Sequence, residues 1–356
     1  MSGWSDDWGP ERQGGRGQAG GRVGAYDRLP PELSVRPRPR RRPRWGRIVA
    51  VLLVVLLLLV VGLTVLMDRR LNRIDALPDY SGRPAATPGT DWLVVGSDSR
   101  AGLTSEQRKQ LATGNAGGQR TDTMMLLHIP RGGGAPTLVS LPRDSFVPIP
   151  GHDPNKLNAA YAFGGPKLLA RTVERATGIR IDHYMEIGFA SFASAVDAVG
   201  GVRICVDHAM RDPKAGLDIK AGCQVLDSRQ ALGYVRTRAT PRADLDRVVR
   251  QRQFLGALVD KAVSPGTLLN PFKSIPLALR GTDSLTVANG DHLWHLFRFL
   301  LAMRSVSGGD GVATTVPVGG TGFEPGAGSV VRWDRPKALA LFRALQQDRP
   351  IPAQGG

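Results

Sequence analysis

The hydrophobic residues of this chain are most concentrated in one uninterrupted run, Ile48–Met67 (IVAVLLVVLLLLVVGLTVLM), which contains no charge. About 20 apolar residues cross about 30 Å of hydrocarbon at about 1.5 Å per residue. Asp68 follows the run, whereas arginines crowd its N-terminal side: Arg36, Arg38, Arg40, Arg41, Arg42, Arg44 and Arg47. Because positive charge is retained on the cytoplasmic side, we predict one transmembrane helix over residues 47–68, with a cytoplasmic N-terminus and an extracytoplasmic body.

Beyond this helix, short apolar runs alternate with segments of helical periodicity. The runs that suit buried strands are Trp92–Gly96, Met124–Ile129, Leu138–Leu141, Tyr184–Ile187 and Val202–Val206. The helical patterns are Lys167–Ala176, Phe189–Val199, Leu245–Val263, Asp291–Met303 (apolar on most sides) and Pro336–Gln347. Alternating β and α segments favour a sheet between helix layers. We therefore predict the α/β class, as a three-layer α/β/α sandwich with a central mixed sheet.

Composition divides the chain further. Residues 1–46 are rich in Gly, Pro and Arg and lack apolar periodicity, which predicts a disordered cytoplasmic tail. Residues 69–90, with Pro78, Pro84 and Pro88, are expected to form a short stalk. Residues 91–350 are expected to form one extracytoplasmic domain that includes the segment after Leu285.

The net charge of +16 changes this picture little. Arginine greatly outnumbers lysine, and we attribute most of that excess to a GC-rich coding genome. The arginine run beside the apolar block is explained by membrane orientation, so nucleic acid is not expected as a partner. Arginine is chemically informative where it clusters in motifs, because its guanidinium group binds phosphate bidentately.

The two cysteines, Cys205 and Cys223, both lie in the predicted extracytoplasmic body and are 18 residues apart. In an oxidising compartment such a pair favours one disulfide, which stabilises by about 3 kcal/mol in the chain-entropy model. The alternative is a pair of buried free thiols.

Two carboxylates flank neighbouring predicted strands. Asp98 lies just beyond Trp92–Gly96, and Asp122 lies just before Met124–Ile129. If these strands are antiparallel neighbours, both carboxylates share one rim of the sheet, and Mg²⁺ is commonly held by one or two carboxylates. Taken alone, without the other motifs, the pair suits loop caps or surface salt bridges with Arg100 and Arg120 better than a metal site.

Arginines gather at the ends of the predicted segments, and guanidinium groups that surround a diphosphate offset its charge. They are Arg100, Arg120, Arg143, Arg236, Arg238 and Arg247. Asp244, Arg247 and Gln251 follow at i, i+3 and i+7 and share one helix face, which alternatively is a solvated face. Lys156 adds a point charge or caps the site. His292 and His295 are one turn apart without a third ligand nearby, so we expect them to pack at a helix surface.

Several motifs occur in order between Asp91 and Leu255: VVGSDSR, RTDTMMLLHI, SLPRDSF, KLNAAYAFGG, DAVGGVRICVD, and ALGYVRTR followed by DLDRVVRQRQ. Together they resemble the LytR-CpsA-Psr family of cell-wall enzymes. The resemblance implies an α/β/α sandwich with a deep apolar tunnel for a polyprenyl chain. It also implies transfer of a glycopolymer from a polyprenyl diphosphate carrier to peptidoglycan, which forms a phosphodiester and leaves polyprenyl phosphate.

The resemblance assigns roles by position. Asp98 and Asp122 would bind Mg²⁺ (or Mn²⁺) and, with Arg143 and Arg247, form the catalytic set. Substrate binding would fall to Arg120, Arg236, Arg238 and Gln251, as it would to Arg143 and Arg247, with Asp244 orienting the arginines. Arg100 and Lys156 are further substrate-binding candidates, which we infer from the residues themselves rather than from the resemblance. Many relatives have Gly-Asp where this chain has Ala243–Asp244. The cysteine pair and the arginine-rich tail resemble actinobacterial members, which favours arabinogalactan over teichoic acid as the polymer.

Two alternatives remain open at this point. One is a non-enzymatic regulator of envelope assembly that binds polyprenyl diphosphate, and the other is a hydrolase that cleaves the lipid diphosphate with water. The intact carboxylate and arginine set favours the transferase. Leu168, Leu169, Phe189 and Phe192 are candidates to line the tunnel, or else they are ordinary core residues.

Overall fold

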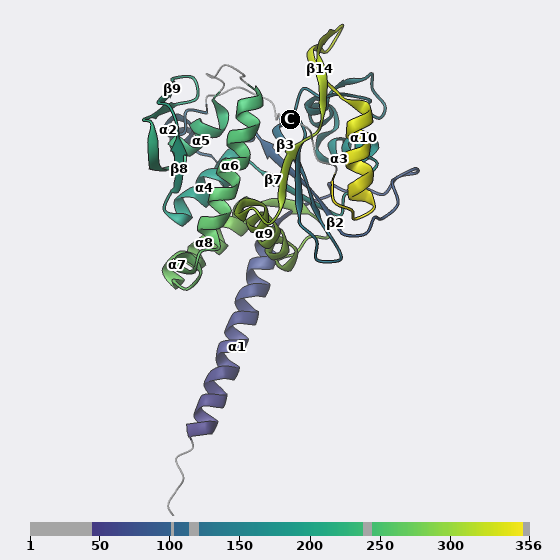
Figure 1. Cartoon of the computed structure of the whole chain (residues 1–356). Coiled ribbons are helices and arrows are strands. Elements are labelled where there is room, and N and C mark those ends of the chain that lie inside the picture. The colour runs from purple at the N-terminus through teal and green to yellow at the C-terminus, as the bar shows by residue number, and fades with distance from the viewer. Residues whose placement is uncertain (1–44, 101–102, 114–120, 238–243, 352–356) are drawn as a thin grey trace, which may run out of the picture. The chain divides into compact units, whose positions relative to one another are not determined.

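The computed structural model of the chain describes residues 45–100, 103–113, 121–237 and 244–351 (Figure 1). The chain divides into two units, residues 1–54 and 55–356. The expected tail, residues 1–46, lies outside the described residues except for Trp45 and Gly46. Helix α1 (Trp45–Arg70) extends a few residues beyond both ends of the predicted span, and its most apolar stretch has a mean hydropathy of 3.4. By length and composition it is able to cross a membrane.

Seven strands form the central sheet in the order β1-β12-β7-β2-β3-β4-β13. Their bounds are β1 Asn72–Ile74, β2 Thr90–Ser97, β3 Thr121–Ile129, β4 Thr137–Ser140, β7 His183–Ile187, β12 Thr286–Ala288 and β13 Val312–Thr315. The β1–β12, β2–β7 and β4–β13 pairs are parallel, and the remaining neighbours are antiparallel. The predicted mixed sheet is confirmed.

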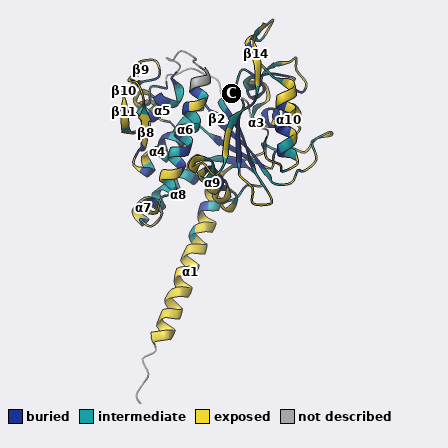
Figure 2. Ribbon diagram, viewed as in Figure 1, coloured by how far each residue is buried: buried dark blue, intermediate teal, exposed yellow. Residues whose placement is uncertain are grey.

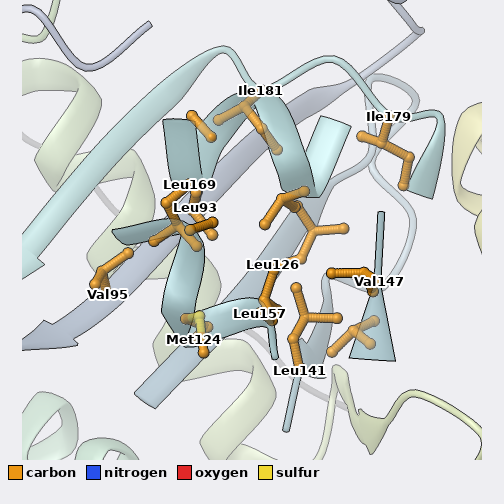
Figure 3. Packing of buried hydrophobic residues seen from close by; sticks show 14 of the residues in the cluster. Leu93, Val95, Met124, Leu126, Leu141, Val147, Leu157, Leu169, Ile179 and Ile181 are labelled. Carbon is orange, nitrogen blue, oxygen red and sulfur yellow. The ribbon is translucent and has the colours of Figure 1, made fainter. Parts of the chain in front are cut away.

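Alternate residues of β2 point to opposite faces of this sheet. Leu93 and Val95 contribute to one core cluster, which packs against α3 (Leu157–Thr177) and α10 (Arg335–Gln346) (Figure 3). Trp92 and Val94 contribute to a second cluster, which packs against α6 (Asp244–Ala262) and α9 (Leu293–Gly308). Since successive side chains of a strand point to opposite faces, helices cover both sides of the sheet, and the three-layer sandwich is confirmed (Figure 2).

A third core cluster is built from helices and small two-stranded sheets. The helices are α4 (Phe189–Val199), α5 (Ser228–Arg236), α6 and α8 (Pro271–Ser284); the strands are β8 (Val202–Val206), β9 (Met210–Asp212), β10 (Leu217–Ile219) and β11 (Gly222–Leu226). Val202–Val206 is therefore a strand as predicted, but it pairs with β11 outside the central sheet. The remaining elements are α2 (Ser105–Gln110), α7 (Pro265–Leu268), β5 (Phe146–Val147), β6 (Asn155–Lys156), β14 (Val318–Glu324) and β15 (Gly328–Trp333).

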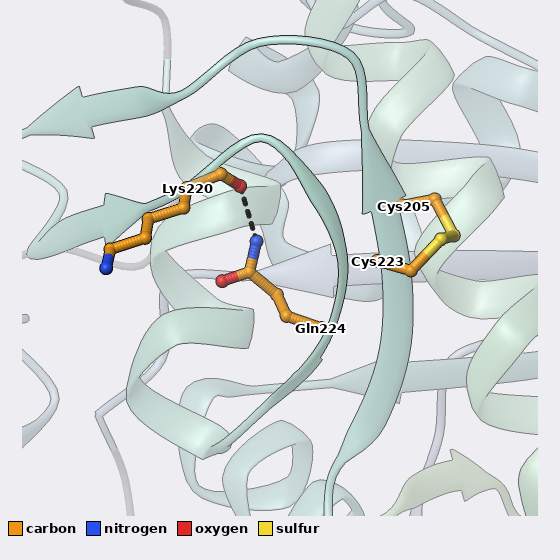
Figure 4. Close-up of a disulfide and its surroundings, with 4 residues drawn as sticks. All are labelled: Cys205, Lys220, Cys223 and Gln224. Atoms are coloured by element: carbon orange, nitrogen blue, oxygen red, sulfur yellow. Dashed lines mark hydrogen bonds between the residues drawn. A yellow bond between two sulfur atoms is a disulfide. The ribbon is translucent and has the colours of Figure 1, made fainter.

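Cys205 and Cys223 lie directly opposite each other in the antiparallel β8–β11 pair and form the predicted disulfide (Figure 4). Their Cα atoms are 3.9 Å apart. Both residues are exposed rather than buried, so the alternative of two buried free thiols is wrong. The bond joins two short strands that form a separate sheet of their own.

The segment expected as a stalk, residues 69–90, is part of the fold. Asn72–Ile74 forms the edge strand β1 of the central sheet, and Ala76 is buried in the first core cluster. Tyr80 donates to Glu174 Oε2 at 2.7 Å, and Arg83 Nε donates to Glu174 Oε1 at 2.9 Å. The prolines interrupt regular structure, but these contacts hold the segment against α3. The end of the chain also belongs to the same fold, because β13 and α10 contribute to the central sheet and its core.

Candidate active site at the rim of strands β2 and β3

The two predicted metal carboxylates lie at one rim of the sheet. In the antiparallel β2–β3 pair, Gly96 is opposite Thr123 and Ser97 is opposite Thr121, with an irregularity between the two pairs. Asp98 directly follows β2, and Asp122 is the second residue of β3. The two strands are therefore antiparallel neighbours, which is the condition for a shared rim. Both carboxylates lie at the same end of this strand pair.

Arg143 joins this rim through Asp122. Its Nη1 donates to Asp122 Oδ1 at 2.6 Å, and its Nε donates to Asp144 Oδ2 at 3.1 Å. The other oxygen of Asp144 pairs with Lys156 Nζ at 3.0 Å. Alternating cations and carboxylates thus form a continuous chain from β3 to Lys156, the N-cap residue of α3. Sequence reasoning missed Asp144, although it directly follows Arg143 in the LPRDS run.

Backbone hydrogen bonds fix the loop that carries Arg143. The N–H of Leu157 donates to Ser145 O at 2.8 Å, and the N–H of Asn158 donates to Arg143 O at 3.1 Å. These are two of the first amides of α3, which have no partner inside their own helix. The loop therefore satisfies the helix terminus, and the helix terminus in turn positions the arginine.

Arg100 follows Asp98 by two residues, and Arg236 ends α5. Both guanidinium groups lie over the same aromatic ring. Their guanidinium carbons lie 5.8 Å and 5.1 Å from the ring centroid of Phe189. Arg100 Nη2 donates to Thr113 O at 2.9 Å, and Arg236 Nη1 donates to Ala112 O at 3.1 Å. One ring and two adjacent carbonyl groups therefore hold two like charges close together.

The electrostatics connect these arginines to the carboxylates. Burial, followed by the positive charge of Arg100, lowers the pKa of Arg236. The charges of Asp122 and Asp98 act in the opposite direction on the same guanidinium group. Arg236 nevertheless remains protonated at neutral pH, because arginine is not deprotonated in proteins. The rim therefore carries protonated guanidinium groups beside carboxylates, and such guanidinium groups suit an anionic ligand.

Two tyrosines near Asp98 donate hydrogen bonds to the buried carboxylate of Glu186. Tyr161 donates to Glu186 Oε1 at 2.8 Å, and Tyr184 donates to Glu186 Oε2 at 2.9 Å. Burial, then the charge of Glu186, raises the pKa of both tyrosines, and Asp98 adds to this effect on Tyr161. Both hydroxyl groups therefore stay protonated and act as donors. Sequence reasoning missed this group, and the position of Tyr161 inside the KLNAAY run was the available signal.

Helix α6 contributes the remaining described site residues. Arg247 is 2% exposed, so it does not belong to a solvated helix face. Gln251 Nε2 donates to Val235 O at 3.2 Å, and Arg250 Nη2 donates to Thr237 O at 2.6 Å. These two bonds flank Arg236 and fasten the end of α5 to α6. Asp244 is the first residue of α6, and its side chain lies outside what the structure describes, as do Arg120 and Arg238 entirely.

The four residues proposed for a tunnel do not come together. Leu169 is fully buried in the first core cluster, and Leu168 packs against that cluster. Phe189 and Phe192 pack instead with Leu103 and other residues of a separate small cluster. Leu168 and Leu169 are therefore ordinary core residues of the α3 layer, as the alternative interpretation stated.

The expectation that His295 has no third ligand-type residue nearby is wrong. His183, Asp291 and His295 place nitrogen or oxygen atoms within 4.8 Å of one another. Asp291 Oδ2 accepts from the amides of Ala288 at 3.0 Å and Tyr184 at 3.2 Å, and Asp291 Oδ1 contacts His183 Nδ1. These contacts already occupy the Asp291 carboxylate. We therefore interpret the cluster as a structural link between β7 and the start of α9.

Comparison with known proteins identifies the family. The sequence model of the LytR_cpsA_psr family matches residues 74–285. The chain is 50% identical to the probable cell wall biosynthesis protein LcpB of Corynebacterium glutamicum, over 92% of this chain and 79% of that protein. It is 35% identical to cell wall biosynthesis protein LcpA of the same organism, over 76% of this chain and 58% of that protein.

Solved structures show the same fold. A LytR-Csp2A-Psr enzyme from Actinomyces oris superimposes with a TM-score of 0.60 at 22% identity, covering 78% of this chain and 96% of that one. Bacillus subtilis TagT superimposes with a TM-score of 0.54 at 24% identity, covering 76% and 93%. The sequence matches and the shared fold lead to one conclusion: the chain belongs to the LytR-CpsA-Psr family of cell wall biosynthesis proteins.

Proposed function

We propose that this protein is a phosphotransferase that moves a glycopolymer from a polyprenyl diphosphate carrier to peptidoglycan. The observation that carries the proposal is the gathering of Asp98, Asp122, Arg100, Arg143 and Arg236 around one rim of the sheet. Phosphoryl transfer asks a protein mainly for positioning and charge stabilisation. A set of fixed guanidinium groups beside paired carboxylates provides both.

A named relative supports the reaction class. The chain is 28% identical to the polyisoprenyl-teichoic acid–peptidoglycan teichoic acid transferase TagT of Bacillus subtilis, over 73% of this chain and 78% of that protein. In the proposed reaction, a peptidoglycan hydroxyl attacks the phosphorus that carries the glycan. The bond from that phosphorus to the bridging oxygen breaks, polyprenyl phosphate leaves with the electron pair, and the proton of the attacking hydroxyl passes to solvent water.

Each described residue has a proposed task. Arg143 binds a diphosphate oxygen while Asp122 and Asp144 fix its orientation, and Lys156 acts through Asp144. Arg100 and Arg236 bind the diphosphate from the side of Phe189. Further diphosphate contacts are proposed by family resemblance for Arg120, Arg238, Arg247 and Gln251, with Asp244 orienting the arginines.

Asp98 and Asp122 fit a divalent cation by the chemistry of their donor atoms. Mg²⁺ and Mn²⁺ prefer carboxylate oxygens, and Mg²⁺ usually completes its shell with waters and phosphate oxygens. The Asp122 side chain remains 40% exposed while it accepts from Arg143, so solvent reaches this carboxylate. When bound, the cation would offset negative charge on the diphosphate. The arginines would share that task.

We propose that α1 anchors the protein, with the N-terminus in the cytoplasm and the catalytic domain outside. The arginines that precede α1 support this orientation. The Cys205–Cys223 disulfide supports it independently, since disulfides persist in oxidising compartments and are rare in the cytosol.

The test uses the full chain in liposomes with a polyprenyl diphosphate-linked glycan, Mg²⁺ and peptidoglycan fragments, followed by mass spectrometry. A glycan-phosphate-muropeptide adduct that is lost in Asp122→Asn and Arg143→Ala would support the transferase. Arg332→Ala is the matched control, because Arg332 is an exposed arginine whose described partner is Glu324 on the β14–β15 hairpin. Release of polyprenyl phosphate without an adduct would indicate the hydrolase. Lipid binding without turnover would indicate the regulator.

A further inference from the structure

Helix α9 has two apolar faces, and the core accounts for only one of them. Its inner face packs into the second core cluster through Leu296, Phe299, Ala302 and Met303. The opposite face exposes Trp294 by 56%, Phe297 by 58% and Leu301 by 46%. These three residues follow the i, i+3, i+7 spacing of one helical stripe. Contiguous exposed apolar residues mark a surface that contacts something else.

The start of this stripe is fastened to the end of α1. The N–H of Leu293 donates to Asp68 Oδ1 at 3.0 Å, and His292 Nδ1 lies 3.0 Å from Asp68 Oδ2. Arg73 connects the same two segments, because its Nη2 donates to Asp68 Oδ2 at 2.8 Å and its Nε donates to Asp291 O at 3.1 Å. Trp294 therefore lies within one helical turn of the residue that is bonded to the last turn of α1.

The charges on α9 fit an anionic surface. The helix contains no acidic residue. Arg298 and Arg304 are exposed, and they lie four residues after Trp294 and three residues after Leu301. Tryptophan concentrates at membrane–water interfaces, and arginine reaches lipid phosphates while its methylene stem stays in apolar surroundings. Aromatic residues and arginines on one exposed helix face suit contact with the plane of the interface rather than a path across the bilayer.

We propose that the outer face of α9 rests in the headgroup region of the membrane that α1 spans, with Trp294, Phe297 and Leu301 inserted between lipids. This inference rests on α1 being the anchor proposed above. Arg298 and Arg304 contact the lipid phosphates beside the stripe. The domain then has two membrane contacts, and the second prevents it from rotating about the axis of a single helix.

The experiment measures membrane depth with spin labels on the full chain in liposomes of phosphatidylcholine and phosphatidylglycerol. Cys205 and Cys223 are joined to each other, so a single introduced cysteine takes the label. Phe297→Cys reports the stripe, and Leu58→Cys reports insertion of α1. Phe323→Cys is the matched control, since Phe323 is a 75% exposed phenylalanine on β14. Leu301→Cys serves as a second reporter if the first variant folds poorly.

The expected result is that labels at 297 and 58 collide several-fold more with oxygen, relative to a water-soluble nickel complex, than the label at 323. A label at 297 that behaves like the one at 323, while the label at 58 is in lipid, would overturn the proposal and leave the anchor intact. A label at 58 that stays in water would overturn the anchor and the proposal together. Neither readout depends on transferase activity, so the outcome is separate from the test of the reaction.

Discussion

Arg143 and Asp122 hold each other in position, with Nη1 donating to Oδ1 at 2.6 Å. The arginine that we propose binds the diphosphate and the carboxylate that we propose binds the metal therefore position each other. Asp144 binds Nε of the same guanidinium group. A guanidinium fork reaches two carboxylates at once, which an ammonium group on a flexible stem does not reproduce.

Arg143→Lys is expected to lower kcat/KM for transfer by about 10²-fold, since a preorganised donor to developing charge is lost. The cation is retained, so lipid binding should fall much less than turnover. Transfer rates in liposomes with labelled donor measure the effect, beside Arg332→Lys. Equal loss of binding and turnover would show that Arg143 only recruits the substrate.

Removal of divalent cations is expected to abolish transfer, and Mg²⁺ or Mn²⁺ should restore it. Asp98→Asn and Asp122→Asn should each raise the Mg²⁺ concentration that is needed on the order of tenfold, because each removes a charged oxygen ligand. Titration of activity against Mg²⁺ measures this, with Asp310→Asn as the control at an exposed loop aspartate. An unchanged Mg²⁺ requirement in both variants would remove the carboxylates from the metal site.

His128 predicts a pH dependence of stability. Its Nδ1 lies 2.9 Å from Asp91 Oδ1, and its Nε2 lies 3.0 Å from Asp348 Oδ1. Burial alone would lower the pKa of His128, but the two carboxylates outweigh burial and raise it. A raised folded-state pKa favours the protonated form. Its contribution is therefore complete below the unfolded value of about 6.5 and is lost as pH rises through the folded pKa.

Unfolding by urea between pH 6 and pH 9 checks this relationship. The free energy of unfolding of the wild-type chain should decline over that range more steeply than that of His128→Gln. His152→Gln is the control, because His152 is an exposed histidine. Parallel pH profiles for wild type and His128→Gln would show that the imidazolium does not contribute.

The Cys205–Cys223 disulfide closes a loop with a sequence separation of 18 residues. The double variant Cys205→Ser, Cys223→Ser is expected to lose about 3 kcal/mol of stability in the chain-entropy model. Transfer activity at low temperature should be nearly unchanged, since the bond lies in the exposed β8–β11 pair. Thermal unfolding with and without dithiothreitol provides the measurement. A Tm that reductant does not lower would contradict the expectation.

The sequence predicted those features that local patterns determine. Trp92–Gly96 became β2 because a short apolar run suits a strand buried on both faces. Lys167–Ala176 identified only the second part of α3, because Gly164 and Gly165 adopt non-helical angles and interrupt the periodicity. Val202–Val206 shows the limit of such patterns, since an apolar run does not indicate which strand will pair with it.

The candidate site likewise has some features that local sequence patterns predict and others that they do not. The proximity of Asp98 and Asp122 followed from the pairing of two consecutive strands. Glu186 was missed because its partner Tyr161 is 25 residues away and no local pattern connects them. Asp144 was missed for a different reason, since its role depends on Lys156 approaching from the start of α3. Contacts between separate segments create these functions, and they appear only when the chain is folded.

The single residue between α1 and β1 limits how far the catalytic domain can travel. A flexible stalk over residues 69–90 would have let the domain reach up to about 70 Å from the end of its anchor, at about 3.3 Å per extended residue. Instead, Arg70 ends α1, and Asn72 already belongs to the edge strand of the central sheet. The connection has almost no slack, so under the proposed function a lipid-linked donor would reach the enzyme by diffusing laterally in the bilayer. Under the same proposal, only an acceptor that itself extends to the membrane surface would meet the donor there.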